Sequence, residues 1–277
     1  MLALLALASS ACWGTSDFFA GLKARTIAAP AVVAVTQGFA LIALSVILLV
    51  RNTGLSPSFI GNGPVWAVGA GVAGALGLVC FYTALASGTM GVVAPISSLG
   101  ALVPVFLGLL TGEQPKATAW VGMAVAVTGA ALASGPELTG DVPPRPVILA
   151  AVAAGCFGAA LYCLDRGARY ALLETLWAMR VTSIAMCLVA AVALRSVGGT
   201  RARDLPALAV IGLGDVTANA LFAFSSSRGM VSVASVLGSL YPVATLFWAR
   251  VLLGERLRRV QTVGVGLTLV GVVAIAL

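Results

Sequence analysis

The chain has 277 residues, of which 60% are hydrophobic and only 9% are charged, with a mean hydropathy of +1.08. Soluble domains are about a quarter charged, so this composition excludes a water-soluble fold and predicts a polytopic membrane protein. The net charge of +7 needs no nucleic-acid partner, because no basic run is interleaved with aromatic residues. The sequence lacks histidine, the commonest general base and metal ligand, so we expect no metal or other cofactor.

Turn-forming clusters and charges divide the chain into ten apolar segments, each about long enough to cross a bilayer as a helix. We predict helices at 2–21, 30–50, 64–86, 91–111, 116–134, 147–165, 173–194, 206–226, 231–252 and 258–277. The first segment has no basic residues before its apolar run, so we interpret it as a membrane helix and not as a secretory signal. The longest polar break predicts a linker at 136–146, between five-helix units at 1–135 and 147–277.

The sequence from about 88 to 133 resembles the sequence from 229 to 277. The two stretches align Pro104 with Pro242, Gly112-Glu113 with Gly254-Glu255, and Gly122 and Gly129 with Gly264 and Gly271. Because five is an odd number, the second unit must enter the membrane from the opposite face. We therefore predict an all-α membrane protein with ten transmembrane helices arranged as two inverted five-helix repeats.

Pro104 and Pro242 fall near the middle of the predicted fourth and ninth helices. Each proline removes one backbone hydrogen bond, and irregular backbone in a membrane is tolerated only against protein or a water-filled cavity. Their matched positions favour a cavity between these two helices. The alternative is a purely structural kink in each helix.

Asp215 and Asn219 lie one turn apart in the predicted eighth helix, with Arg180 in the seventh. A carboxylate near the membrane midplane costs on the order of 3 kcal/mol unless it faces a cavity or a partner. Asp215 is therefore a candidate contact for a substrate amine or a proton, with Asn219 adding a hydrogen bond; the alternative is an interhelical pair. Arg180 could hold a substrate carboxylate or extend to the membrane surface. Gln37 occupies the corresponding place in the second helix.

Trp13 and Asp17 share one face of the predicted first helix. Because Asp17 falls near the predicted end of that helix, a carboxylate at the membrane surface close to Lys23 is the favoured interpretation, and a substrate contact is the alternative. Three tyrosines are further candidates for lining a cavity, although aromatic residues in membrane helices more often pack or lie at the interface. They are Tyr82, Tyr162 and Tyr241.

Glu113 and Glu255 precede equivalent predicted helices. A carboxylate at a helix start interacts favourably with the helix dipole, so we expect a structural role for both. Ser97, Ser98, Ser235 and Ser239 flank the two matched prolines, and we expect them to bond to nearby backbone carbonyls.

These motifs together resemble the EamA family of the drug/metabolite transporter superfamily. The resemblance rests on Trp13-Gly14, on the prolines of the fourth and ninth helices, and on LLTGE and LLGERL before the fifth and tenth helices. It implies a ten-helix secondary transporter of the cell membrane with an inverted repeat, often an exporter of amino acids or other small metabolites. The sequence lacks the G-x-x-x-x-G-K-[ST] motif of ATPases, so we expect a proton or other gradient to drive transport, with protons as the candidate coupling ion.

The orientation and two other classes of function stay open. The basic residues are more numerous in the loops opposite the termini, which would place both termini outside, whereas the resemblance implies cytoplasmic termini. A non-transporting membrane receptor or scaffold is the first alternative function. An intramembrane enzyme is the weaker alternative, because the sequence offers no histidine and no recognisable nucleophile and base.

Overall fold

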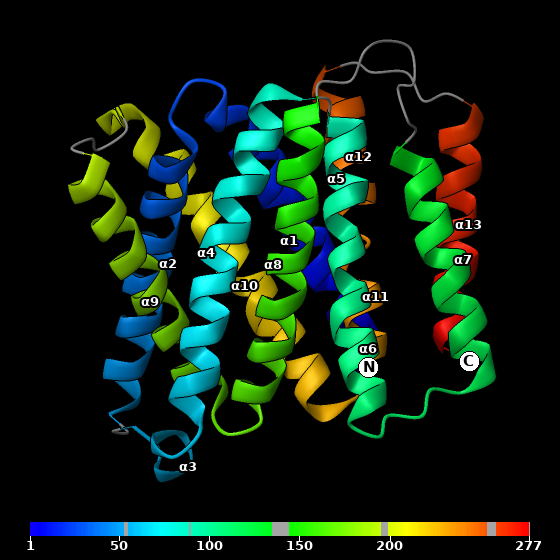
Figure 1. Cartoon of the computed structure of the whole chain (residues 1–277), viewed down its shortest axis with the longest axis horizontal. Coiled ribbons are helices and arrows are strands. Elements are labelled where there is room, and N and C mark those ends of the chain that lie inside the picture. The colour runs from blue at the N-terminus through cyan, green and yellow to red at the C-terminus, as the bar shows by residue number, and fades with distance from the viewer. Residues whose placement is uncertain (53–54, 89, 135–143, 195–198, 254–258, 277) are drawn as a thin grey trace.

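The computed structural model describes residues 1–52, 55–88, 90–134, 144–194, 199–253 and 259–276, and within these ranges the regular structure is entirely helical (Figure 1). The elements are α1 (Leu2–Ala24), α2 (Ala29–Arg51), α3 (Pro57–Ile60), α4 (Gly63–Ser87), α5 (Met90–Ser98), η1 (Leu99–Ala101), α6 (Leu102–Leu110), α7 (Ala117–Ser134), α8 (Pro144–Ala168), α9 (Leu172–Leu194), η2 (Ala202–Asp204), α10 (Leu205–Arg228), α11 (Val231–Gly238), α12 (Tyr241–Leu253) and α13 (Arg259–Ala276). Within the described ranges, each segment that the sequence predicts to be helical is mostly helix.

The chain is a multi-pass membrane protein by the length and apolarity of its helices. In the described ranges, seven helices are long and apolar enough to cross a membrane, and three shorter apolar helices accompany them. Large apolar side chains such as Leu49, Val189 and Val210 are more than two-thirds exposed. Exposed side chains of this kind are stable where lipid surrounds the bundle.

Two of the predicted segments are broken near their middle. The segment from Met90 to Leu110 is split by the 3₁₀ turn η1, and the segment from Val231 to Leu253 is split at Ser239 and Leu240. Pro104 is the third residue of α6 and Pro242 is the second residue of α12. Since neither proline has a backbone N–H to donate to the carbonyl four residues earlier, a continuous helix is weakened at both places.

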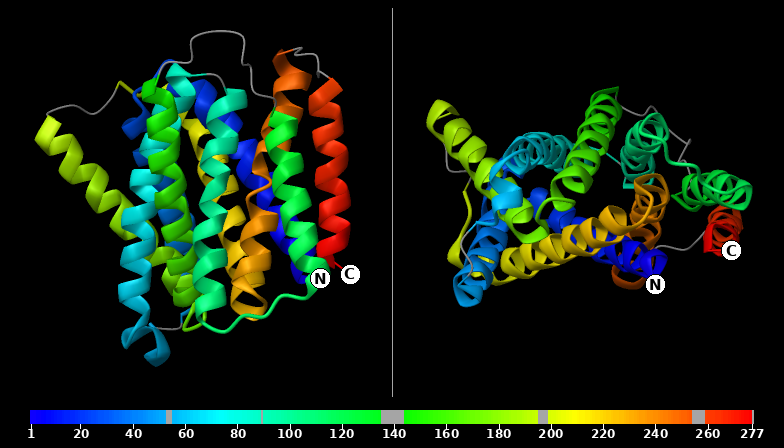
Figure 2. Two further views of the ribbon diagram at one scale, coloured as in Figure 1. Left: turned by 45° about the vertical axis from the view of Figure 1, so that its right-hand side comes forward. Right: turned by 90° about the horizontal axis from the view of Figure 1, so that it is seen from below.

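The helices form one bundle whose most extensive pairings are α7 with α13, α4 with α8, and α1 with α10. Figure 1 shows α7 and α13 at one edge and α2 and α9 at the opposite edge, and the end-on view in Figure 2 agrees. The two labelled termini lie toward the same end of the bundle (Figure 1).

Glycines allow α7 and α13 to approach closely. A Cβ atom on Gly129 would lie 2.4 Å from the backbone nitrogen of Thr268, and one on Gly271 would lie 2.4 Å from that of Ala126. Such small residues bring helix backbones into van der Waals contact, which is the main attraction between helices in lipid.

Candidate functional site

A cavity lies between the two broken helices. It contains about 680 Å³ of space free of protein atoms, a volume that includes space open to solvent. The first break contributes Ser97, Ser98, Gly100 and Ala101 to its lining, and the second contributes Gly238, Ser239 and Tyr241. Pro104 and Pro242 are buried and are not themselves in the lining, so each sits just beyond the residues that face the cavity.

A buried ion pair joins two helices at the cavity. The Arg180 Nη2 atom of α9 lies 3.0 Å from the Asp215 Oδ2 atom of α10, and the Arg180 side chain is 1% exposed. The Arg180 Nη1 group also donates a hydrogen bond of 2.5 Å to the Gln37 side-chain oxygen. Gln37 in turn donates to Asp215 Oδ2 at 3.3 Å. Arg180 therefore does not extend to the membrane surface, and that alternative is wrong because Gln37 and Asp215 hold the guanidinium inside the bundle.

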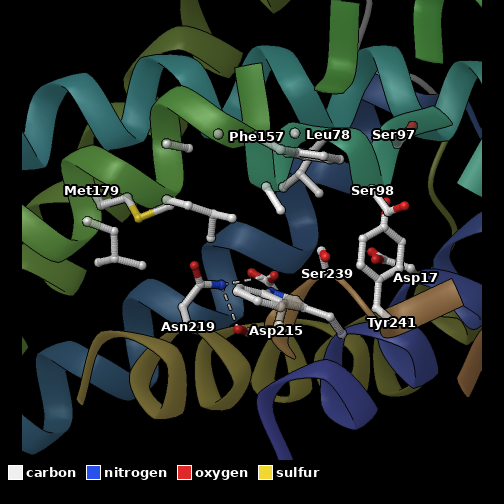
Figure 3. A pocket seen from close by; sticks show the side chains of 18 of the residues that line it. Asp17, Leu78, Ser97, Ser98, Phe157, Met179, Asp215, Asn219, Ser239 and Tyr241 are labelled. Carbon is white, nitrogen blue, oxygen red and sulfur yellow. Dashed lines mark hydrogen bonds between the residues drawn. The ribbon is translucent and has the colours of Figure 1, made fainter. Parts of the chain in front are cut away.

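Asn219 completes the surroundings of Asp215. Its side-chain amide donates to the Asp215 backbone carbonyl at 2.8 Å and to Asp215 Oδ1 at 3.1 Å. Figure 3 shows the two side chains on α10, across the pocket from Phe157 and Leu78. Asp215 thus forms the interhelical pair of one interpretation and also faces the cavity.

Asp17 lies deeper than the sequence suggests. It is 7% exposed, lines the cavity and accepts a hydrogen bond of 3.1 Å from the Tyr82 hydroxyl. Lys23 instead pairs with Asp204 at 2.8 Å. The favoured interpretation of Asp17 as an interfacial carboxylate near Lys23 is therefore wrong, because α1 continues for two turns beyond Asp17 to Ala24.

Three of the four aromatic candidates lie in or next to the cavity. Trp13 and Tyr241 line the cavity; the Trp13 ring packs 5.7 Å from that of Phe222, and the Tyr241 hydroxyl donates to the Ala94 carbonyl at 3.3 Å. Tyr82 is not part of the cavity lining, but its hydroxyl donates the hydrogen bond to Asp17 described above.

Tyr162 does not reach the cavity. It is half-buried and its ring packs edge-on against Trp66, with centroids 6.1 Å apart. Expecting Tyr162 in the site was wrong because the cavity face of α8 carries Phe157, Ala160, Leu161 and Leu164 instead. This spacing of three and four residues marks one face of a helix, and Tyr162 points off it.

Two of the serines beside the breaks, Ser97 and Ser239, bond to backbone carbonyls as expected. The expectation was wrong for Ser235, whose buried hydroxyl has no hydrogen-bond partner among the described residues. Ser97 donates to the Ala150 carbonyl at 3.4 Å and Ser239 to the Val236 carbonyl at 2.8 Å. The apolar lining from α4 and α9, Leu78 and Met179, was not predicted. Such residues carry no chemical signal in a sequence this apolar.

Glu113, which lies between α6 and α7, bonds to the start of α11. Its carboxylate accepts hydrogen bonds from the Val231 and Ser232 backbone N–H groups at 2.6 and 3.0 Å, and from the Ser232 hydroxyl at 2.6 Å. It therefore caps the start of α11 and not the helix that follows it in sequence, which begins only at Ala117. Glu113 does interact with a helix start, as expected. The expected helix was wrong, because the helix is α11 and not α7. Glu255 lies outside the described residues.

Among the described residues, no group of three or more histidine, cysteine, aspartate or glutamate side chains is placed to hold a metal ion. The chemistry that the site offers is that of two carboxylates, one guanidinium, two side-chain amides and several aromatic faces. These groups can recognise a small charged molecule by ion pairing and hydrogen bonding.

A multi-pass helical bundle with buried charges beside a cavity is typical of membrane transporters. The chain belongs to the EamA-like transporter family, whose sequence profile matches residues 1–135 and 144–277. This match confirms the resemblance found in the sequence. A crystal structure described only as that of a protein superposes with a TM-score of 0.79 over 99% of this chain and 95% of the other, at 17% sequence identity. That likeness concerns the fold alone. No curated protein matches the sequence as a relative.

Proposed function

We propose that the protein is a secondary transporter that exports small metabolites bearing an amino group, such as amino acids, across the cell membrane. The observation that carries this proposal is the cavity between the two broken helices, with the Arg180–Asp215 ion pair at its wall. Discontinuous membrane helices supply unpaired backbone groups to substrates near the midplane. Charged residues inside a membrane bundle usually mark a substrate or ion pathway.

We further propose that ten helices cross the membrane as two inverted five-helix units, 1–135 and 147–277. The helix pairings support this symmetry. The contact of α4 with α8 has its counterpart in that of α10 with α1, and the contact of α4 with α9 has its counterpart in that of α10 with α2. A two-fold exchange of the units converts each pairing into its counterpart.

The glycines of α7 and α13 support the inverted arrangement at the level of single residues. A Cβ atom on Gly122 would lie 2.8 Å from the Gly271 carbonyl oxygen, and one on Gly129 would lie 2.8 Å from that of Gly264. The sequence repeat aligns Gly122 with Gly264 and Gly129 with Gly271. The two contacts therefore interchange under the repeat, and their reversed order along the helices requires antiparallel packing.

Alternating access then takes place by movement of the two units around the cavity, driven by a proton gradient. The test uses purified protein in proteoliposomes with an acidic lumen and a panel of labelled amino acids and amines. We expect uptake of at least one compound, stimulated by the acidic lumen and abolished by a protonophore. Uptake that does not change with the proton gradient would contradict proton coupling. Absence of flux for the whole panel would contradict the proposed transport function.

A matched pair of variants on α10 tests the site. Asn219→Leu keeps the branching and the number of non-hydrogen atoms of the side chain but removes the amide that bonds Asp215, and we expect transport to fall by about tenfold or more. Thr217→Leu changes an exposed residue of the same helix and is expected to transport normally. An Asn219→Leu protein that elutes as a single folded species and transports at the wild-type rate would contradict the site assignment.

A further inference from the structure

The charges that line the cavity do not balance. Asp17 and Asp215 are acidic and Arg180 is basic, so the lining carries one negative charge more than it carries positive when all three are ionised. Arg180 is committed to Asp215 and Gln37, which leaves Asp17 without a counter-charge. No ion pair in the described ranges includes Asp17.

The surroundings of Asp17 suit a cation. Among the described residues, the Tyr82 hydroxyl, a neutral group, donates a hydrogen bond to the Oδ1 atom of Asp17 and leaves Oδ2 available. Trp13, Phe157 and Tyr241 present aromatic rings to the same cavity, and Figure 3 shows Tyr241 at the end of the pocket where Asp17 lies. Aromatic faces attract organic cations, so the cavity combines the Asp17 carboxylate with aromatic rings that favour a positive charge, and Tyr241 is the ring beside Asp17.

Arg180 offers a second contact that does not require a charged ligand. Its Nε–H group is buried and has no hydrogen-bond partner among the described residues. An unpaired buried donor costs free energy that a ligand oxygen can recover. Because the positive charge of Arg180 is already compensated by Asp215, a neutral acceptor such as a hydroxyl or carbonyl oxygen satisfies this group.

We propose that the cavity binds a monocationic amine with an apolar or aromatic body and a neutral hydrogen-bond acceptor, with the ammonium on Asp17 and the acceptor near Arg180 Nε. This inference rests on the transporter function proposed above and narrows its substrates to amines without a carboxylate, so the zwitterionic amino acids named there as examples become the weaker substrates. A monocation brings the net charge of the occupied cavity to zero, whereas a zwitterionic amino acid leaves one negative charge buried. Uncompensated charge inside a membrane protein is unfavourable.

The test compares L-phenylalaninol with L-phenylalanine by titration calorimetry on the full-length protein in detergent. The two compounds differ only in a hydroxymethyl group in place of the carboxylate, so at neutral pH one is a monocation and the other a zwitterion. We expect L-phenylalaninol to bind about tenfold more tightly, which corresponds to about 1.4 kcal/mol. Equal binding, or tighter binding of L-phenylalanine, would overturn the proposal.

Two variants test whether the charge of Asp17 causes the preference for L-phenylalaninol. Asp17→Asn removes the excess negative charge and should abolish the preference for L-phenylalaninol without reversing it, because the remaining Asp215 and Arg180 still pair with each other. Asp204→Asn changes a carboxylate that pairs with Lys23 outside the cavity and should keep the preference. A preference that survives Asp17→Asn would overturn the assignment of the ammonium to Asp17.

Asp215→Asn provides a test that does not depend on the stability of the Asp17 variant. It leaves Asp17 and Arg180 as single opposite charges in the cavity, so the preference should reverse toward L-phenylalanine. An unchanged preference in this variant would contradict the charge-balance argument.

If L-phenylalaninol does not bind while the proteoliposomes transport other metabolites, the inference fails and the transporter stands. If no compound is transported but L-phenylalaninol binds selectively, the transporter fails and the binding site stands.

Discussion

Replacing Arg180 by methionine should destabilise the protein by leaving Asp215 as a buried carboxylate without a counter-charge. The two side chains are 1% and 8% exposed and approach to 3.0 Å. Removing one partner of a buried ion pair costs about 3–5 kcal/mol. Asp215 would still accept hydrogen bonds from the amides of Gln37 and Asn219, at 3.3 and 3.1 Å, so we expect the lower end of that range. A loss of ~3 kcal/mol lowers the folding equilibrium constant about a hundredfold.

The assay is reversible unfolding in mixed micelles, titrated with SDS and followed by tryptophan fluorescence, on a double-mutant cycle. The cycle compares Arg180→Met, Asp215→Asn and the combined variant. Since the combined variant leaves neither charge unpaired, its loss of stability should be smaller than the sum of the two single losses by about 2 kcal/mol. Arg250→Met, at an exposed position of α12, serves as the control and should change the stability by less than about 0.5 kcal/mol.

Two results would refute this reasoning. One is an Arg180→Met protein as stable as the Arg250→Met control. The other is additivity of the two single changes to within about 0.5 kcal/mol, which is the behaviour of independent sites. Either result would mean that the guanidinium and the carboxylate do not compensate each other inside the bundle.

Three further changes probe the packing and the breaks. Glu113→Ala removes the cap of α11 and should lower the unfolding free energy by about 1–2 kcal/mol; an unchanged SDS midpoint would contradict the capping role. Gly129→Ala places a methyl group 2.4 Å from a backbone nitrogen of α13 and should lower the unfolding free energy by about 1–3 kcal/mol. Gly266→Ala is the control, because its methyl group meets no atom within 4 Å, and it should leave the unfolding free energy unchanged. Pro104→Ala restores the donor for the Gly100 carbonyl and should slow proteoliposome uptake several-fold without loss of stability; uptake at the wild-type rate would show that the break does not serve transport.

The helices could be predicted from the sequence because their signals are local. The predicted segment 30–50 corresponds to α2 at Ala29–Arg51, since apolar length and flanking turn residues act within one segment. The matched prolines gave the positions of both breaks for the same reason. The depth of Asp17 was not predictable in this way. The prediction ended the first helix at residue 21, and the partner that keeps Lys23 away from Asp17 is Asp204, 181 residues further along the chain.

The orientation of side chains around a helix was the second limit. Phe157 and Tyr162 lie five residues apart, which separates their directions by about 140° on an α-helix. The sequence favours either aromatic residue equally as a cavity lining, and only the packing of α8 against α4 and η1 decides for Phe157. The capping of α11 by Glu113 is non-local in the same sense, because the two elements are more than a hundred residues apart.

The helix pairings described above have a consequence for how the chain holds together. The three most extensive pairings, α7 with α13, α4 with α8, and α1 with α10, each join a helix of the first family segment to a helix of the second. Each segment therefore covers a large part of the surface of the other, in addition to the contacts that helices make within a segment. Residues 1–135 expressed alone should expose these surfaces and aggregate, and co-expression with 144–277 should restore assembly.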